Sequence, residues 1–162
     1  MGWLSTQEQL QYKKYGFYSK NLTLKNGRTY DKTRIIAINT MSCYYFNFNL
    51  LQARYDPGAQ LDWLEKELAS LDGVGGRAII IGHVPPLFSE CAHGWSVRYQ
   101  ALVERYQNVI KFGLFGHDHT EQIQLITSPK NNQKRIGLQF MGGSATTFWK
   151  NNPSFTVINV DD

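Results

Sequence analysis

Residues 77–86 read RAIIIGHVPP, a short β-branched run that ends in a glycine, a histidine and two prolines. The run at 78–81 predicts a buried strand, and Gly82 with the following prolines marks the point where the chain leaves it. A second stretch, KFGLFG at 111–116, ends similarly and is followed by HDHT. Three of the four histidines therefore follow two predicted strands.

The segments around these strands predict an α/β fold. Residues 34–40 form another predicted strand. One helical pattern lies between this strand and 77–83, and a second lies between 77–83 and 111–116. This order of strands and helices predicts a parallel α/β layer. Three later segments are predicted strands, antiparallel because their connections are too short for helices: 122–127, 135–141 and 154–160.

Both intervening helices have recognisable sequence signals. Asp56 supplies an acceptor side chain and Pro57 a favourable first residue, and the glycines at 73, 75 and 76 end the apolar pattern that follows. The second helix is expected to begin near Ser96. Its expected buried residues are Tyr99, Leu102, Val103 and Tyr106.

The composition indicates a single globular domain over residues 1–162, with 42% hydrophobic and 14% aromatic residues. No apolar run approaches the ~20 residues of a membrane helix, and the first fourteen residues lack the apolar stretch of a secretory signal. The net charge of +4 comes from scattered lysines and arginines. That pattern indicates a solvated surface, so no nucleic-acid partner is expected.

His83, His117 and His119 are predicted to share one rim of the sheet, because ligands of α/β sheets gather at the carboxyl ends of strands. Gly82 and Gly116 are expected to let the backbone turn sharply and to leave room. In an extended segment His117 and His119 would point the same way, toward one metal cluster. We therefore predict metal ligands.

The alternative for each histidine is a polar loop residue held by backbone hydrogen bonds. One histidine alone would favour that alternative, whereas three at two neighbouring strand ends favour a metal site. His93, in CAHGW, lacks the glycine context and is expected to be a loop residue.

The motifs GHVPP and FGHDHT resemble the last two motifs of the calcineurin-like metallophosphoesterases. With DPGAQLDWLEKEL, RYQNVIKFGLFGHDHTEQ and GGSATTFWKNNPSFTVINVD, the chain is similar to the C-terminal half of the catalytic domain of the acid sphingomyelinase family, from about Trp3 to Asp161. The resemblance implies a partial calcineurin-like sandwich of mixed β-sheets flanked by helices, with its N-terminal half missing. It also implies a secreted or lysosomal hydrolase that, when intact, converts sphingomyelin to ceramide and phosphocholine.

The resemblance implies that His83 and His117 bind one zinc and His119 another. Such a two-metal centre clamps phosphate oxygens and activates a water for attack on phosphorus. The earlier Asp-x-His, Gly-Asp and Gly-Asn-His motifs of the family do not occur here, and Asp118 is not expected to replace the bridging aspartate. No catalytic residue is therefore identified in this sequence, and three imidazoles alone are expected to hold two metals poorly.

Two interpretations follow from the missing motifs. The chain is a fragment of a full enzyme, or it is a noncatalytic binding module whose histidines hold a single zinc or nothing. Either way, half of one core would be absent and apolar sheet surface would be exposed. We therefore expect association, with the missing half or with a second copy.

Two further features are connected with the secretory route. Cys43 and Cys91 match positions that form a disulfide in the family, although the loop from His83 to Cys91 is longer here; two buried free thiols are the alternative. The sequence NLT makes Asn21 a candidate glycosylation acceptor.

The chain departs from the family where substrate would bind. YYFNFNLL follows Cys43 where the sphingomyelinases carry an acidic residue near the choline head group, and Phe148 replaces a tyrosine. An aromatic face can attract a quaternary ammonium, and it can equally stack a nucleobase. Relatives that cleave nucleotide phosphodiesters are therefore an alternative for the substrate class.

Overall fold

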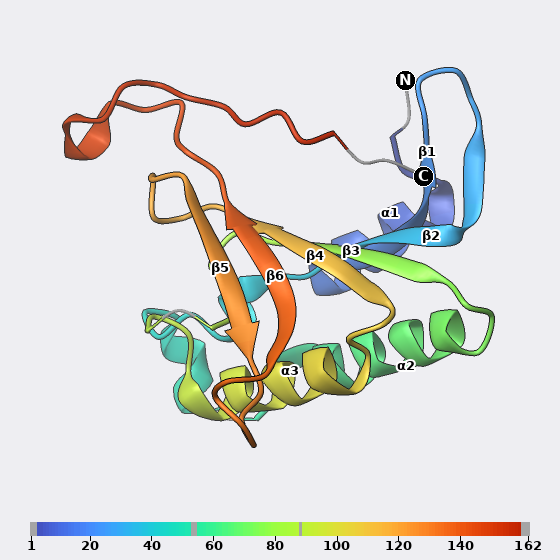
Figure 1. The fold of residues 1–162 in the computed structure, drawn as a ribbon, viewed down its shortest axis with the longest axis horizontal. Helices are drawn as coiled ribbons and strands as arrows, with labels where there is room; N and C mark the ends of the chain where they lie inside the picture. Colours follow the sequence, from blue (N-terminus) through green and yellow to red (C-terminus); the bar gives the residue numbers. More distant parts are fainter. Residues whose placement is uncertain (1–2, 53–54, 88, 160–162) are drawn as a thin grey trace.

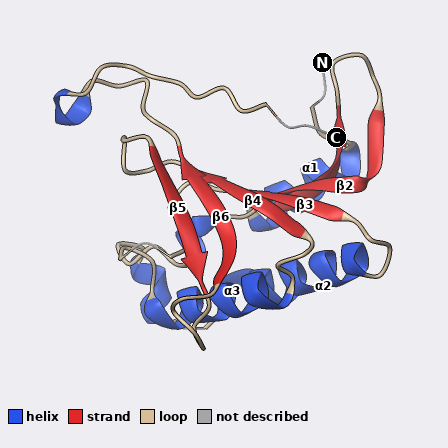
Figure 2. Ribbon diagram, viewed as in Figure 1, coloured by secondary structure: helices blue, strands red, loops and turns tan. Residues whose placement is uncertain are grey.

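The computed structural model describes residues 3–52, 55–87 and 89–159. A six-stranded mixed sheet has two helices side by side along one face, and the C-terminal segment runs over the other face (Figure 1). Long loops gather at one end of the sheet (Figure 2). Among the described residues, none of the helices has the length and apolar character needed to cross a membrane.

The strand order is β1-β2-β3-β4-β6-β5. The pairs β2–β3, β3–β4 and β4–β6 are parallel, whereas β1–β2 and β5–β6 are antiparallel. The strands are β1 (Tyr18–Thr23), β2 (Thr29–Ala37), β3 (Arg77–Ile81), β4 (Ile110–Phe115), β5 (Gln122–Thr127) and β6 (Arg135–Met141). The helices are α1 (Thr6–Tyr15), α2 (Gln60–Asp72) and α3 (His93–Arg105).

The predicted α/β class and parallel layer are confirmed, because β2, α2, β3, α3 and β4 follow one another and the three strands are parallel neighbours. Helix α2 buries Leu61, Leu64, Leu68 and Leu71 in one core cluster with residues of β3 and α3. The side chains of Ala78 and Ile80 face these helices because alternate residues of a strand share a face.

The start of α2 differs in detail from the prediction. Pro57 begins a short 3₁₀ turn, Gly58 has φ 72°, and the α-helix itself begins at Gln60. Asp56 still caps the helix, since its carboxylate accepts hydrogen bonds from the backbone N–H groups of Leu61 and Asp62. Asp56 and Pro57 therefore both mark the helix start, but they lie at the start of the 3₁₀ turn that precedes the regular α-helix.

Helix α3 also begins earlier than predicted. His93 is its first residue, so the expectation of a loop histidine was wrong. Tyr99, Val103 and Tyr106 are buried as predicted, but Leu102 is only partly buried. Trp95 is buried as well, in the helical turn that precedes Ser96.

The predicted strand at 154–160 was wrong for the part that the structure describes. Residues 154–159 contain no regular secondary structure, and Val160 lies outside the described residues. A strand needs a neighbour for its backbone hydrogen bonds. This segment instead crosses over the sheet, where Phe155 and Val157 are exposed (Figure 1).

The sheet face opposite α2 and α3 is apolar. Ile79, Phe112, Leu114 and Phe140 are half-buried there, and the rings of Phe112 and Phe140 lie 5.9 Å apart. A cavity of about 450 Å³ separates β4 and β6 from the terminal segment. Neither helix in the core covers this face (Figure 1).

Candidate metal centre

The carboxyl ends of β3 and β4 lie side by side, as predicted. Backbone bonding continues beyond both strands, since Gly82 N donates to Leu114 O at 3.1 Å and Gly116 N to His83 O at 2.9 Å. These bonds bring the His83 and His117 rings together, with centroids 5.2 Å apart and planes at 84°. The gap between His83 Nε2 and His117 Nδ1 is 3.4 Å.

This gap fits one metal ion held by both rings. Two nitrogen ligands at about 2.0–2.1 Å from a tetrahedral zinc lie roughly 3.3–3.4 Å apart. Burial and the neighbouring imidazoles of His117 and His119 lower the pKa of His83 below its ordinary value. His83 is therefore neutral at neutral pH, the form that binds a metal.

His119 lies near this pair, but its own contacts differ. Its Nδ1 is buried and has no hydrogen-bond partner among the described residues, and its ring lies 5.9 Å from that of Phe148. The Asn151 side chain donates to the His119 carbonyl at 3.3 Å. Burying a ring nitrogen without a hydrogen bond costs free energy. A bound metal would give this nitrogen a partner, so its position is compatible with a metal ligand.

The geometric reason for pairing His117 with His119 was wrong. Their φ angles are 78° and 58°, so the segment is not extended and the two rings do not simply point the same way. Within the described part of the chain, no group of three or more His, Cys, Asp or Glu side chains is arranged to hold a metal. The structure thus pairs the rings of His83 and His117, and His119 lies nearby without completing a three-residue metal group among the described residues.

Gly82 and Gly116 have different roles from those predicted, because neither has a positive φ. A Cβ on Gly82 would lie 2.9 Å from Phe115 Cε1 and 3.2 Å from Ile38 Cγ1. A Cβ on Gly116 would meet only the His83 ring, at ordinary distances of 3.6 Å from Nδ1 and 4.0 Å from Cε1. Close packing therefore requires a glycine at position 82 and not at 116.

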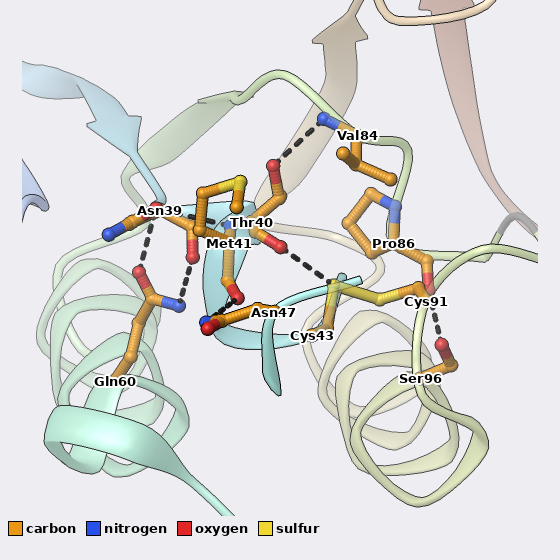
Figure 3. Close-up of a disulfide and its surroundings, with 10 residues drawn as sticks. All are labelled: Asn39, Thr40, Met41, Cys43, Asn47, Gln60, Val84, Pro86, Cys91 and Ser96. Carbon is orange, nitrogen blue, oxygen red and sulfur yellow. Dashed lines mark hydrogen bonds between the residues drawn. A yellow bond between two sulfur atoms is a disulfide. The ribbon is translucent and has the colours of Figure 1, made fainter. Parts of the chain in front are cut away.

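The predicted disulfide between Cys43 and Cys91 is present, and both cysteines are buried (Figure 3). The two segments also form an isolated antiparallel bridge, in which Tyr45 N donates to Glu90 O at 2.9 Å and Ala92 N to Cys43 O at 2.7 Å. The loop after β2 is thereby joined to the loop after β3.

Two hydrogen-bonded contacts strengthen this junction (Figure 3). Thr40 Oγ1 accepts from the buried N–H of Val84 at 2.8 Å, directly after His83. Gln60 exchanges two hydrogen bonds with the backbone of Asn39, at 2.6 and 3.1 Å. The start of α2 and the loop after β2 therefore support the loop that carries His83.

Two residues of this junction, Glu90 and Tyr44, contact the histidine pair. Neither contact was predicted from the sequence. The Glu90 carboxylate contacts His117 Nε2, on the side of the ring opposite His83. The ring of Tyr44 meets that of His117 edge-on at 5.3 Å, and burial, with the Glu90 charge, raises the pKa of Tyr44. Their positions next to Cys43 and Cys91 are the only sequence signal that could have found them.

The remaining sequence candidates are dispersed. Asp118 accepts hydrogen bonds from the side chains of Thr120 and Gln122. Phe148 is 61% exposed beside His119. Asn21 is half-buried in β1, next to a β-bulge.

Comparison with known proteins gives one group of relatives. The chain is 31% identical over 159 residues to the sphingomyelin phosphodiesterase of Homo sapiens, covering 98% of this chain and 24% of that protein. It is 35% identical over 128 residues to the sphingomyelin phosphodiesterase of Bos taurus, covering 79% of this chain and 20% of the relative. The acid sphingomyelinase-like phosphodiesterase 3b of Homo sapiens is 33% identical over 131 residues, covering 76% of this chain and 28% of that protein.

The chain is therefore similar to one region of these phosphodiesterases, and it spans about a quarter of their length. No family model matches it.

Proposed function

We propose that this chain is the C-terminal part of a metallophosphoesterase catalytic domain of the acid sphingomyelinase-like type. The observation that carries the proposal is the 3.4 Å gap between His83 Nε2 and His117 Nδ1, at adjacent carboxyl ends of a parallel sheet. Relatives named sphingomyelin phosphodiesterases support the reaction class.

In this proposal His83 and His117 hold one zinc and His119 holds a second. A bound divalent metal would supply Lewis-acid stabilisation of a phosphate oxygen and a water of lowered pKa. The chain's own residues bind and orient: His83 and His117 present facing nitrogens, and His119 presents its unpartnered Nδ1. The bridging carboxylate and the proton donor would come from residues outside this sequence.

Sphingomyelin is the proposed substrate, and the exposed ring of Phe148 beside His119 would flank the reacting phosphate. The same exposed ring would also suit a nucleobase, which keeps a nucleotide phosphodiester as the alternative substrate. Turnover of sphingomyelin and of a nucleotide phosphodiester by the intact enzyme separates the two. A preference for the nucleotide would exclude the lipid assignment.

A secreted or lysosomal location belongs to the same proposal. The disulfide between Cys43 and Cys91 supports it, because such bonds persist mainly in oxidising compartments. Asn21 would then be available to the glycosylation machinery.

Metal content per chain tests the proposal directly. Protein purified without chelators or a histidine tag should retain at least one zinc per chain by elemental mass spectrometry. His83→Ala and His117→Ala should each lose it, whereas the matched variant His93→Ala in α3 should keep it. Wild-type protein with almost no divalent metal would contradict the proposal.

That negative result would favour the second candidate, a noncatalytic binding module. The observation in its favour is that the described residues gather no set of three metal-binding side chains. In that case His83 and His117 would be polar rim residues of the sheet.

A further inference from the structure

We infer that Glu90 is a positioning residue for metal binding: its carboxylate holds His117 through Nε2 and thereby presents Nδ1 toward His83. This inference rests on the proposed function, since it concerns the same site. It assigns to Glu90 a part that neither its position in the sequence nor the names of the relatives suggest.

The first step is that the two ring nitrogens of His117 have different partners. Nε2 contacts the Glu90 carboxylate, and Nδ1 lies 3.4 Å from His83 Nε2. A neutral imidazole has one N–H donor and one lone pair, and an ionised carboxylate only accepts. The proton of a neutral His117 ring therefore belongs on Nε2, which leaves the Nδ1 lone pair facing His83.

The second step is the outer partner that metal-binding histidines use. Such histidines almost always donate their other ring N–H to a carboxylate, a carbonyl or water, which fixes the tautomer and makes the ligating nitrogen more basic. Glu90 occupies that outer position. It cannot share a metal with Nδ1, because it lies at the opposite side of the ring.

The third step is that Glu90 is itself held in place. Its carbonyl accepts from Tyr45 N, the next residue forms the disulfide to Cys43, and Tyr44 packs against the His117 ring. The side chains of Glu90 and His117 are 30% and 20% exposed, so the contact is partly shielded from solvent. The disulfide and the backbone bonds beside it thus fix the position of Glu90 next to His117.

The first measurement uses the metal-free chain. With ¹⁵N-labelled histidine at pH 8, we expect a downfield, slowly exchanging N–H proton on His117 Nε2, assigned by its absence in His117→Ala. Glu90→Ala should abolish this resonance, and Glu90→Gln, which keeps an acceptor oxygen, should restore it in part. The control Glu65→Ala removes a carboxylate paired with Arg105 and should leave it unchanged. Persistence of the resonance in Glu90→Ala would overturn the inference.

The second measurement is zinc affinity by competition with a chromogenic chelator. Glu90→Ala should bind zinc about 10- to 100-fold more weakly, as for lost outer-shell partners in other sites, with Glu90→Gln intermediate and Glu65→Ala within twofold of wild type. Equal affinity in Glu90→Ala would refute the positioning role. A wild-type chain that binds no zinc would refute the proposed function and the metal role of Glu90, while the N–H resonance would still decide whether Glu90 fixes the ring.

Discussion

The two histidines after β4 hold a backbone conformation that few side chains adopt. His117 and His119 have φ angles of 78° and 58°, a region that costs an L-residue roughly 1–2 kcal/mol. Strained residues of this kind cluster at functional sites, where the surrounding structure holds them. Here the holding contacts include Glu90 at His117 and Asn151 at His119.

This strain predicts a difference between two ways of removing the His119 side chain. His119→Gly should be more stable than His119→Ala by about 1 kcal/mol, because only glycine adopts a positive φ without cost. At His93, the first residue of α3, the order should reverse, since alanine favours a helix over glycine. Urea unfolding of the four metal-free variants measures both differences; equal stabilities at position 119 would contradict the strain.

Sequence reasoning placed the histidines at the correct strand ends but missed their conformation and partners. The GHVPP and FGHDHT motifs follow strands, and strand ends can be predicted from short β-branched runs. The φ angles and the Glu90 contact depend on how the loops joined by the disulfide pack together. No local pattern near His117 contains that information.

Among the elements, the loop after β2 acts as a support for the loop after β3. Thr40 is 2% exposed and Val84 1% exposed, and the hydrogen bond between them lies directly beside His83. Loops near a binding site are usually held by such contacts to rigid elements.

Thr40→Val should therefore destabilise the chain by about 1–3 kcal/mol, because the buried N–H of Val84 loses its acceptor. Thr33→Val is the matched control, a half-buried position in β2 where a β-branched apolar residue suits a strand. It should leave the free energy of unfolding within about 0.5 kcal/mol of wild type. Equal losses in the two variants, measured by urea denaturation, would show that the hydrogen bond contributes nothing specific.

The elements also differ in how well the sequence predicted them. Helix α2 has leucines at helical spacing, and β5 and β6 were predicted with their observed bounds. Helix α1 buries no residue and so has no apolar period, although Ser5 and Glu8 form a capping box that could have revealed it. The segment at 154–159 resembles a strand in composition but forms no regular pairing with the described strands.

At the scale of the whole molecule, the helices cover one sheet face and leave the other with half-buried apolar residues. Ile79 and Phe112 pair on this face, and Phe112 contacts Phe140. An apolar surface of this kind marks an interaction site on soluble proteins.

We expect the chain to associate through this face when no other partner is present. Static light scattering at micromolar concentration should give a mass above 18.6 kDa, the mass of one chain. Phe112→Gln should shift the mass toward that of a monomer, whereas Phe48→Gln, at an exposed ring in a 3₁₀ turn, should not. A wild-type monomer would contradict the expectation.

The backbone bond from Gly116 to His83 also bears on how the proposed metal would bind. Because that bond and its neighbour at Gly82 extend the sheet itself, strand pairing alone brings the two histidine loops together. Preformed sites avoid the ordering penalty of flexible ones. If the proposed metal binds, it would therefore find the two loops already side by side, so metal binding would follow folding.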